Sequence, residues 1–317
     1  MSHPIRQIAI IGAGAVGSYY GARLAEAGHD VHFLLRSDYD AVAANGLHIE
    51  SVDGNINLDV PSISTNSADI GPVDWVICAL KATSMHQAHD LLAPCIGDHT
   101  RILVLMNGLG IEEQFAIWFP STPVFGGLAF TCINRGDPGQ IHHIDYGPIT
   151  LAHLGDNPDE IARALSLWDG AKVTVLTAPS LLAARWQKLC WNVPFNGLTV
   201  TAGGVTTDIV MHDPDLRAAA EELIRELVAT GNADLATHGT SVRLDDAEVI
   251  DSMMTRTDDM AAYKPSTMID FVEGREMEVA AIFEVPRRRA AELGVPTPLL
   301  TAITGQMRVL GARSQDI

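Results

Sequence analysis

Apolar positions in the first half of the chain follow two alternating patterns. Short apolar runs of the kind that form buried strands cover 5–11, 31–35, 75–80 and 102–106. Apolar residues at helical spacing cover 15–27, 84–93 and 111–119. Strands that alternate with helices in this way predict a parallel, doubly wound sheet of the Rossmann type.

The second half of the chain has a different pattern. Residues 122–155 still favour strands and turns, but beyond about Pro179 nearly every segment has helical period. These helical stretches cover 181–193, 214–238, 245–260, 277–293 and 298–310. We therefore expect an α/β protein of two domains, a Rossmann-type domain over 1–178 and an all-helical domain over 179–317. We expect a packed hinge near 176–180 to join them beside a cleft.

A glycine motif follows the first predicted strand and opens the first predicted helix. It has the form GxGxxG and consists of Gly12, Ala13, Gly14, Ala15, Val16 and Gly17. The first glycine allows a tight turn, the second lets the backbone approach a pyrophosphate, and the third permits close packing of helix on strand. Unpaired N–H groups at the helix start bind the phosphates. The motif predicts a dinucleotide site, with a purely structural turn as the alternative.

The residue at the end of the second predicted strand determines whether such a site prefers NAD or NADP. An acidic residue there binds the ribose hydroxyls of NAD, whereas a cation accommodates the 2′-phosphate of NADP. Arg36 stands at this position, Ser37 adds a hydroxyl, and the nearest acid, Asp38, lies two residues beyond. We therefore expect NADPH as the cofactor, with Arg36 on its 2′-phosphate. Lys81 and Asn107 follow two further strands at the same carboxyl edge, where such sheets bind ligands, and are expected to contact cofactor or substrate.

An ordered series of motifs runs through most of the chain. In the first half these are Gly12–Gly17 with Gly21 and Ala27-Gly28, Arg36, Leu80-Lys81, Asn107-Gly108-Leu109-Gly110, and Pro138-Gly139 with His143 and Gly147. In the second half they are Trp186-Gln187-Lys188-Leu189, Asn192, Asn196-Gly197-Leu198-Thr199, Pro265-Ser266, Glu278-Val279, and Gly294-Val295-Pro296-Thr297-Pro298. Any one could arise by chance, but the whole series in this order resembles the ketopantoate reductases (2-dehydropantoate 2-reductases).

The resemblance implies an oxidoreductase that uses NADPH to reduce 2-dehydropantoate to pantoate, a step of pantothenate and coenzyme A synthesis. Lys188 matches the family's catalytic lysine, which protonates the ketone oxygen, and a nearby Glu278 would keep that ammonium charged or orient it. The residues that match substrate-binding positions are Asn107, Asn192, Asn196, Ser266 and Glu278. Lys81, Asn107 and Glu278 match positions beside the cofactor. The chemistry agrees, because a ketone that accepts hydride builds negative charge on its oxygen and needs a positioned acid or cation.

The spacing of three of these residues supports a common site. Lys188, Asn192 and Asn196 are four apart, so a continuous helix places them on one face. Pro194 lies between the two asparagines and should kink or restart the helix, and the sequence leaves both outcomes open. Helix capping is the structural alternative for the asparagines.

Three departures from the family pattern leave the exact substrate open. They are Gly197 where many members have proline, Phe283-Glu284 in place of a frequent Asn-Gly, and an insertion around 255–264. The enzymatic alternatives are a reductase of another branched 2-oxo acid and an opine-type or 2-hydroxy-acid dehydrogenase. The non-enzymatic alternative is a protein that senses NADP(H). Lys188 with Glu278 argues against a sensor, because sensors usually lose their catalytic groups.

The charge of the chain and the spacing of its cysteines limit which binding partners and which cellular compartment are expected. The formal net charge of −18, from 39 acidic and 21 basic side chains, disfavours nucleic acid. The basic cluster Arg287-Arg288-Arg289 is interpreted as a solvated helix face. No apolar run approaches the ~20 residues that span a bilayer, and four well-separated cysteines favour reduced thiols in a cytoplasm over metal or disulfide sites. We expect a cytoplasmic enzyme with a small 2-oxo acid substrate and no metal, and leave the oligomeric state open, with a homodimer as one option.

Overall fold

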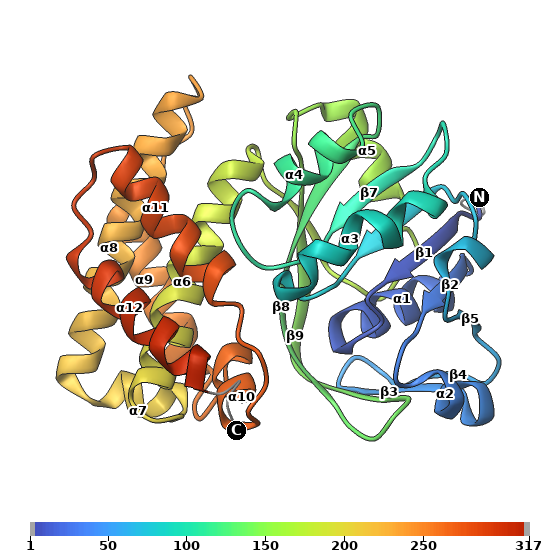
Figure 1. The fold of residues 1–317 in the computed structure, drawn as a ribbon, viewed down its shortest axis with the longest axis horizontal. Coiled ribbons are helices and arrows are strands. Elements are labelled where there is room, and N and C mark those ends of the chain that lie inside the picture. Colours follow the sequence, from blue (N-terminus) through green and yellow to red (C-terminus); the bar gives the residue numbers. More distant parts are fainter. Residues whose placement is uncertain (1–3, 314–317) are drawn as a thin grey trace. The chain divides into compact units, whose positions relative to one another are not determined.

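The computed structural model describes residues 4–313 and divides them into two compact units (Figure 1). Unit 1 holds the chain up to Met106 and again from Gly110 to Leu181. Unit 2 holds Asn107–Leu109 and everything from Leu182 onward. The chain therefore enters unit 2 twice, first for three residues and then for its whole C-terminal part. Within residues 4–313, none of the helices combines the length and the apolar character that crossing a bilayer requires.

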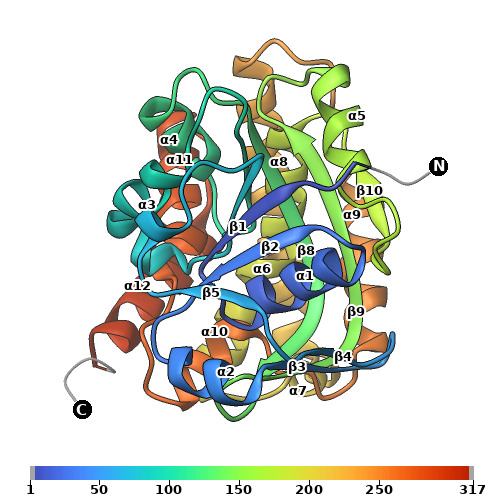
Figure 2. The same cartoon turned by 90° about the vertical axis from the view of Figure 1, so that its right-hand side faces the viewer.

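Unit 1 is built on one mixed sheet in the order β4-β3-β9-β8-β7-β6-β1-β2-β5, with β10 paired to β9. Its strands are β1 (Gln7–Ile11), β2 (Asp30–Leu34), β3 (Leu47–Ser51), β4 (Ile56–Leu58), β5 (Ser62–Ser64), β6 (Trp75–Cys78), β7 (Arg101–Val104), β8 (Val124–Arg135), β9 (Gln140–His153) and β10 (Val175–Thr177). From β5 through β2, β1, β6 and β7 to β8, neighbouring strands are all parallel. Figure 2 shows β1, β2 and β5 side by side at one end of this series. This half of the sheet is the predicted doubly wound core.

The other half of the sheet corrects the expectation of a wholly parallel arrangement. β8 and β9 form a long antiparallel hairpin, and β3 and β4 also pair in antiparallel orientation. The hairpin turns at Pro138-Gly139, where Gly139 has a φ of +82°, a conformation that glycine adopts without a Cβ penalty. Strands and turns were expected over 122–155, but their alternation does not say which neighbours they pair with.

Helices cover both faces of this sheet. They are α1 (Ala15–Glu26), α2 (Tyr39–Asn45), α3 (Met85–Leu92), α4 (Ile111–Trp118) and α5 (Pro158–Ser166), with 3-10 turns η1 (Ser67–Asp69), η2 (Ala82–Ser84) and η3 (Ala93–Cys95). Alternate residues of β1 enter opposite cores, because side chains alternate across a strand. Ile8 and Ile10 pack with Tyr19 of α1, whereas Ala9 and Ile11 belong to the cluster that contains Phe115 of α4.

Unit 2 is helical throughout its C-terminal part. Its helices are α6 (Leu181–Thr201), α7 (Thr207–His212), α8 (Pro214–Thr237), α9 (Asp246–Asp259), α10 (Ser266–Val272), a π-helical segment η4 (Ala280–Glu284), α11 (Val285–Glu292) and α12 (Pro298–Arg313). The predicted fold class, a Rossmann-type sheet followed by an all-helical part, is confirmed.

Two details of unit 2 differ from simple helical expectation. α6 runs through Pro194 without ending. Proline removes one backbone hydrogen bond, but Val193 and Phe195 beside it are fully buried, and their packing holds the helix together on both sides. The stretch expected as one helix over 277–293 begins with the π-helical turn η4 and becomes α-helical only at Val285. Such π-turns frequently occur at functional sites.

Candidate active site

The turn after β1 is shaped for close backbone approach. Gly12 has a φ of +95°, and a Cβ added there would lie 2.6 Å from the backbone nitrogen of Leu80. A Cβ on Gly17 would lie 2.3 Å from the carbonyl oxygen of Gly12. Both positions therefore require glycine, the first for the turn against the end of β6 and the second for packing α1 on the turn.

Gly14 is glycine for a different reason. A Cβ there would meet nothing within 4 Å, so the residue borders open space at the start of α1. The helix has no side-chain cap and no acidic residue in its first turn. Its hydrogen-bond ladder starts with the N–H of Ser18 donating to the carbonyl oxygen of Gly14 at 2.9 Å, which leaves the N–H groups of Ala15, Val16 and Gly17 ahead of the ladder. Open space before uncapped N–H groups fits a pyrophosphate.

Lys81 belongs to the same region of unit 1. It directly follows Leu80, the residue whose backbone the Gly12 turn approaches, and it precedes η2. Its side chain is exposed.

The end of β2 carries two residues that behave differently. Arg36 is exposed and has no ion-pair partner among residues 4–313. Asp38 is buried, and the guanidinium Nη2 of Arg135 donates to its Oδ1 at 2.5 Å. The Ser37 hydroxyl also donates to Asp38 Oδ1, at 2.9 Å. Arg36 is thus available to an anion, while Asp38 is already paired.

In unit 2, α6 presents the predicted polar residues as a row. Lys188, Asn192 and Asn196 recur every four residues along this uninterrupted helix, and all three are buried. Because i and i+4 lie above one another on a helix, the three face the same way. Lys188 is only 7% exposed. These residues are called the polar row.

Asn196 makes hydrogen bonds with both ends of its amide. Its Nδ2 donates to the carbonyl oxygen of Asn192 at 2.9 Å, and its Oδ1 accepts the N–H of Thr267 at 3.0 Å. Thr267 is in the first turn of α10, whose N-cap residue, Pro265, supplies no side-chain acceptor. Asn196 therefore caps α10 from a helix 71 residues away and fixes the start of that helix, Ser266, beside α6. Ser266 itself is exposed.

Asn107 and Glu278 are joined by a hydrogen bond within unit 2. Asn107 Nδ2 donates to Glu278 Oε2 at 3.2 Å, and Glu278 is buried. The next residue, Gly108, has a φ of +122°, and a Cβ there would lie 2.7 Å from the Cβ of Ala281 in η4. Glycine at 108 therefore allows the Asn107 segment to approach the π-helical turn that follows Glu278.

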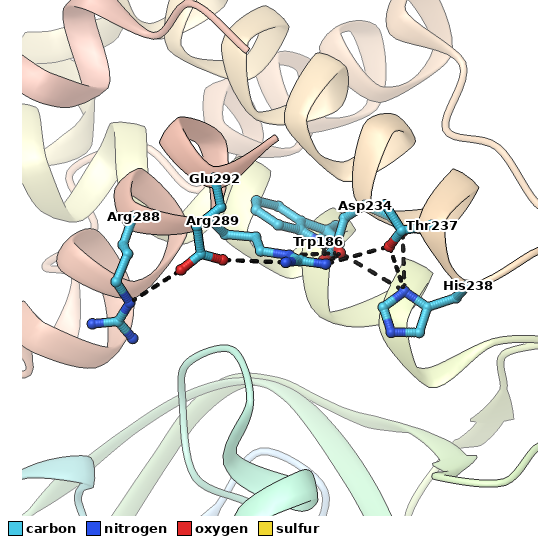
Figure 3. A network of polar contacts seen from close by, with 7 residues as sticks. All are labelled: Trp186, Asp234, Thr237, His238, Arg288, Arg289 and Glu292. Carbon is cyan, nitrogen blue, oxygen red and sulfur yellow. Dashed lines mark hydrogen bonds and ion pairs between the residues drawn. The ribbon is translucent and has the colours of Figure 1, made fainter. Parts of the chain in front are cut away.

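A buried carboxylate that the sequence did not point to anchors α6 (Figure 3). Asp234 of α8 accepts Trp186 Nε1–H on Oδ2 at 2.9 Å, and Arg289 Nη2–H on Oδ1 at 2.6 Å. Asp234 thus ties α6, two residues before Lys188, to α8 and α11. Because Arg289 pairs with this buried carboxylate, the interpretation of the basic cluster as a solvated helix face is wrong for Arg289, whereas Arg288 is exposed and pairs only with the exposed Glu292 among the described residues. The sequence signal that could have identified Asp234 is an acidic residue among the apolar positions of the predicted helix over 214–238.

The side chains of residues 4–313 offer no metal centre, since nowhere in that range do three His, Cys, Asp or Glu groups gather as ligands. The functional groups available for catalysis or binding are therefore a lysine, asparagine amides and a carboxylate in unit 2. In unit 1 they are the backbone N–H groups of the glycine turn and the cations Arg36 and Lys81.

Comparison with known families shows the family to which the chain belongs. The model of the family described as ketopantoate reductase PanE/ApbA matches residues 8–156, and the model of its C-terminal part matches residues 180–311. The chain belongs to the ketopantoate reductase family. It is accordingly a pyridine-nucleotide-dependent oxidoreductase that acts on CH–OH groups, and the predicted family and enzyme class are confirmed.

Individual members of the family resemble the chain over nearly its whole length. A 2-dehydropantoate 2-reductase of Nostoc sp. is 38% identical over 316 residues, which cover 98% of this chain and 97% of that protein. The crystal structure of 2-dehydropantoate 2-reductase from Geobacter metallireducens has a TM-score of 0.90 at 38% identity, covering 97% and 99% of the two chains. A D-mandelate dehydrogenase solved with NADH and anilino(oxo)acetate shares the fold, with a TM-score of 0.86 at 22% identity, covering 98% and 99%.

Proposed function

We propose that this chain is an NADPH-dependent reductase of 2-dehydropantoate, a branched 2-oxo acid, and forms the corresponding 2-hydroxy acid, pantoate, for pantothenate and coenzyme A synthesis. The observation that carries the proposal is the polar row, a buried lysine aligned with two buried asparagines on α6. The hydrogen-bonded pair Asn107–Glu278 in the same unit adds an oriented carboxylate. The activity named for the Nostoc and Geobacter proteins supports this substrate.

Lys188 is the proposed catalytic acid. When bound, the reduced nicotinamide supplies hydride to the ketone carbon, and negative charge builds on the ketone oxygen. Lys188 stabilises that charge and then donates its proton to the oxygen. Its burial strengthens the interaction, because few waters compete for the developing charge. Glu278 keeps the ammonium group charged and orients it.

The remaining site residues bind and position. Asn192 and Ser266 are proposed to hold the carboxylate and hydroxyl groups of the substrate, with Asn196 acting on the same site. Asn107, whose amide is already oriented by Glu278, is proposed to lie beside the nicotinamide and the ketone. Lys81, after the strand that the glycine turn approaches, is proposed to contact the cofactor.

NADPH is proposed over NADH because of Arg36. The fold itself does not decide, since the D-mandelate dehydrogenase with the same fold was solved with NADH. Arg36 is exposed, unpaired within residues 4–313, and stands at the position where a cation accommodates a 2′-phosphate.

A kinetic survey tests the proposal. NADPH and NADH oxidation are followed against 2-dehydropantoate and a panel of other branched 2-oxo acids, each with and without an added amine. We expect turnover with NADPH, highest for 2-dehydropantoate and independent of amine. A better 2-oxo acid would correct the substrate, and a requirement for amine would indicate an opine-type dehydrogenase. Tight NADPH binding without any turnover would favour a sensor.

We also propose a reducing, cytoplasmic location. None of the four cysteines, Cys78, Cys95, Cys132 and Cys190, forms a disulfide within residues 4–313, and all four are buried. Burial raises the pKa of the Cys78 thiol to about 12 and that of Cys95 to about 11, so both remain protonated and unreactive at neutral pH. Assembly as a homodimer remains one option, which gel filtration with light scattering would decide.

A further inference from the structure

An acidic residue closely follows the arginine that is proposed to bind the 2′-phosphate. Asp38 is two residues after Arg36 and follows the same strand, β2. A carboxylate near this position normally favours NAD, because it binds ribose hydroxyls and repels the 2′-phosphate of NADP. A chain that has both an arginine and an aspartate here needs some means of suppressing the charge of the aspartate.

Arg135 supplies that means. It is the last residue of β8, 97 positions from Asp38 in the chain, and its Nη2 donates to Asp38 Oδ1 at 2.5 Å. The Asp38 side chain is 10% exposed and that of Arg135 is 47% exposed. Burial alone would raise the pKa of Asp38, but the hydrogen bonds from Arg135 and Ser37 outweigh it and hold that pKa below its ordinary value. Asp38 is therefore a carboxylate at neutral pH whose charge is balanced by a guanidinium.

The arrangement leaves Arg36 as the unbalanced charge at the end of β2. The Asp38–Arg135 pair is neutral as a whole, and Ser37 points its hydroxyl proton at the carboxylate. Without Arg135, the charge of Asp38, two residues beyond Arg36, would be left without its guanidinium partner and would repel a phosphate bound by Arg36. Because two charges several ångströms apart at a protein surface interact by an amount worth about tenfold in affinity, the effect is measurable.

We propose that Arg135 is a specificity-determining residue, which neutralises Asp38 and so permits Arg36 to bind the 2′-phosphate of NADPH. The inference rests on the proposed function for its cofactor. It assigns to the β8–β9 hairpin a part in choosing between NADPH and NADH, and it requires no contact between Arg135 and the cofactor.

The test is a titration of the full chain with NADPH and with NADH, followed by cofactor fluorescence without substrate. The variants are Arg135→Gln, Asp38→Asn and the double variant. Arg288→Gln is the matched control, since it removes the same charge from an exposed ion pair, Arg288 being 63% exposed beside Glu292. Thermal unfolding of each variant checks that it is folded, and Arg135→Met, which also removes the charge, replaces Arg135→Gln if that variant is not. Arg135→Lys, which keeps the charge, is a further control.

We expect Arg135→Gln to weaken NADPH binding about tenfold and to leave NADH binding within about twofold. Adding Asp38→Asn should restore NADPH binding, and Arg288→Gln should change neither. Arg135→Lys should bind NADPH like wild type. Equal NADPH binding by wild type and Arg135→Gln overturns the inference. A double variant as weak as Arg135→Gln also overturns it, by showing that Arg135 touches the phosphate or only supports the hairpin. A wild type that prefers NADH instead overturns the proposed cofactor, an outcome read from the unmutated chain alone.

Discussion

The Nδ2 atom of Asn107 donates a hydrogen bond of 3.2 Å to Oε2 of Glu278, although the two residues are 171 positions apart. Asn107 follows β7 along the chain, yet it belongs with the helical unit. The close approach of Gly108 to Ala281 holds this segment against η4. The Asn107 amide and the Glu278 carboxylate therefore orient each other, and we expect a substitution of either residue to change the orientation of the other.

This relationship predicts non-additive kinetics. Asn107→Ala and Glu278→Gln should each lower kcat/KM. The double variant should lose much less than the product of the two single losses, because groups in direct contact share their effect. Steady-state kinetics of the four proteins gives the coupling. Fully additive losses would mean that the two side chains serve separate functions.

Lys188→Ala should lower kcat by ~10²–10⁴-fold, the usual contribution of a general acid, and raise KM less. NADPH affinity should remain near that of wild type, because Arg36 and the glycine turn are in unit 1. Lys172→Ala, which removes an exposed lysine paired with Glu26, is the control and should change neither constant. A kcat within a few-fold of wild type would remove Lys188 as the acid and make Glu278 the next candidate for that role.

Asn196 should act on substrate binding through Ser266. Asn196→Ala removes the cap of α10 and should raise KM for the 2-oxo acid, but in a Ser266→Ala background it should raise KM little further. Thr199→Val is the control, since among residues 4–313 the Thr199 hydroxyl donates only within α6, to the carbonyl oxygens of Phe195 and Asn196. An unchanged effect of Asn196→Ala in both backgrounds would mean that Asn196 contacts the substrate independently.

Arg36→Ala should cost roughly 1.5–3 kcal/mol of NADPH binding, the value of one charge-assisted hydrogen bond. NADH lacks the 2′-phosphate, so its affinity should barely change. Isothermal titration with both cofactors measures the difference. If the variant and the wild type discriminate equally between NADPH and NADH, another residue recognises the phosphate.

Asp234→Ala should lower the free energy of unfolding by about 2–3 kcal/mol, because it leaves the buried Trp186 N–H and the Arg289 guanidinium without their shared acceptor. Glu292→Gln breaks an exposed ion pair with the same arginine and should cost less than about 0.5 kcal/mol. Urea unfolding of both variants makes the comparison. Equal losses would show that Asp234 is not the anchor of α6.

The sequence predicted the parts of the fold that local patterns determine. The apolar runs and helical periods located β1, α1, β2 and most helices of unit 2, because burial on one or both faces leaves its period in the chain. It did not predict the antiparallel β8–β9 hairpin, since strand pairing depends on distant partners. The passage of α6 through Pro194 also depends on burial by other helices, which propensity does not record.

The same division applies to the site. The glycine turn and the spacing of Lys188, Asn192 and Asn196 are local features and were visible in the sequence. The cap that Asn196 provides to α10 and the Asp38–Arg135 pair join residues 71 and 97 positions apart. The residues that flank each partner in the chain do not indicate these pairings, because each partner stands in an ordinary helix, strand end or turn and its contact depends on the folded structure.

Transfer of deuterium from NADPH labelled at C4 of the nicotinamide tests the proposed reaction most directly. The chain is incubated with 2-dehydropantoate and each of the two C4-labelled forms in turn, and the product is analysed by mass spectrometry and NMR. Hydride transfer to the ketone predicts pantoate with one deuterium at C2 from one labelled form and none from the other. Product without deuterium from either form, or no product at all, would contradict reduction of this 2-oxo acid by NADPH.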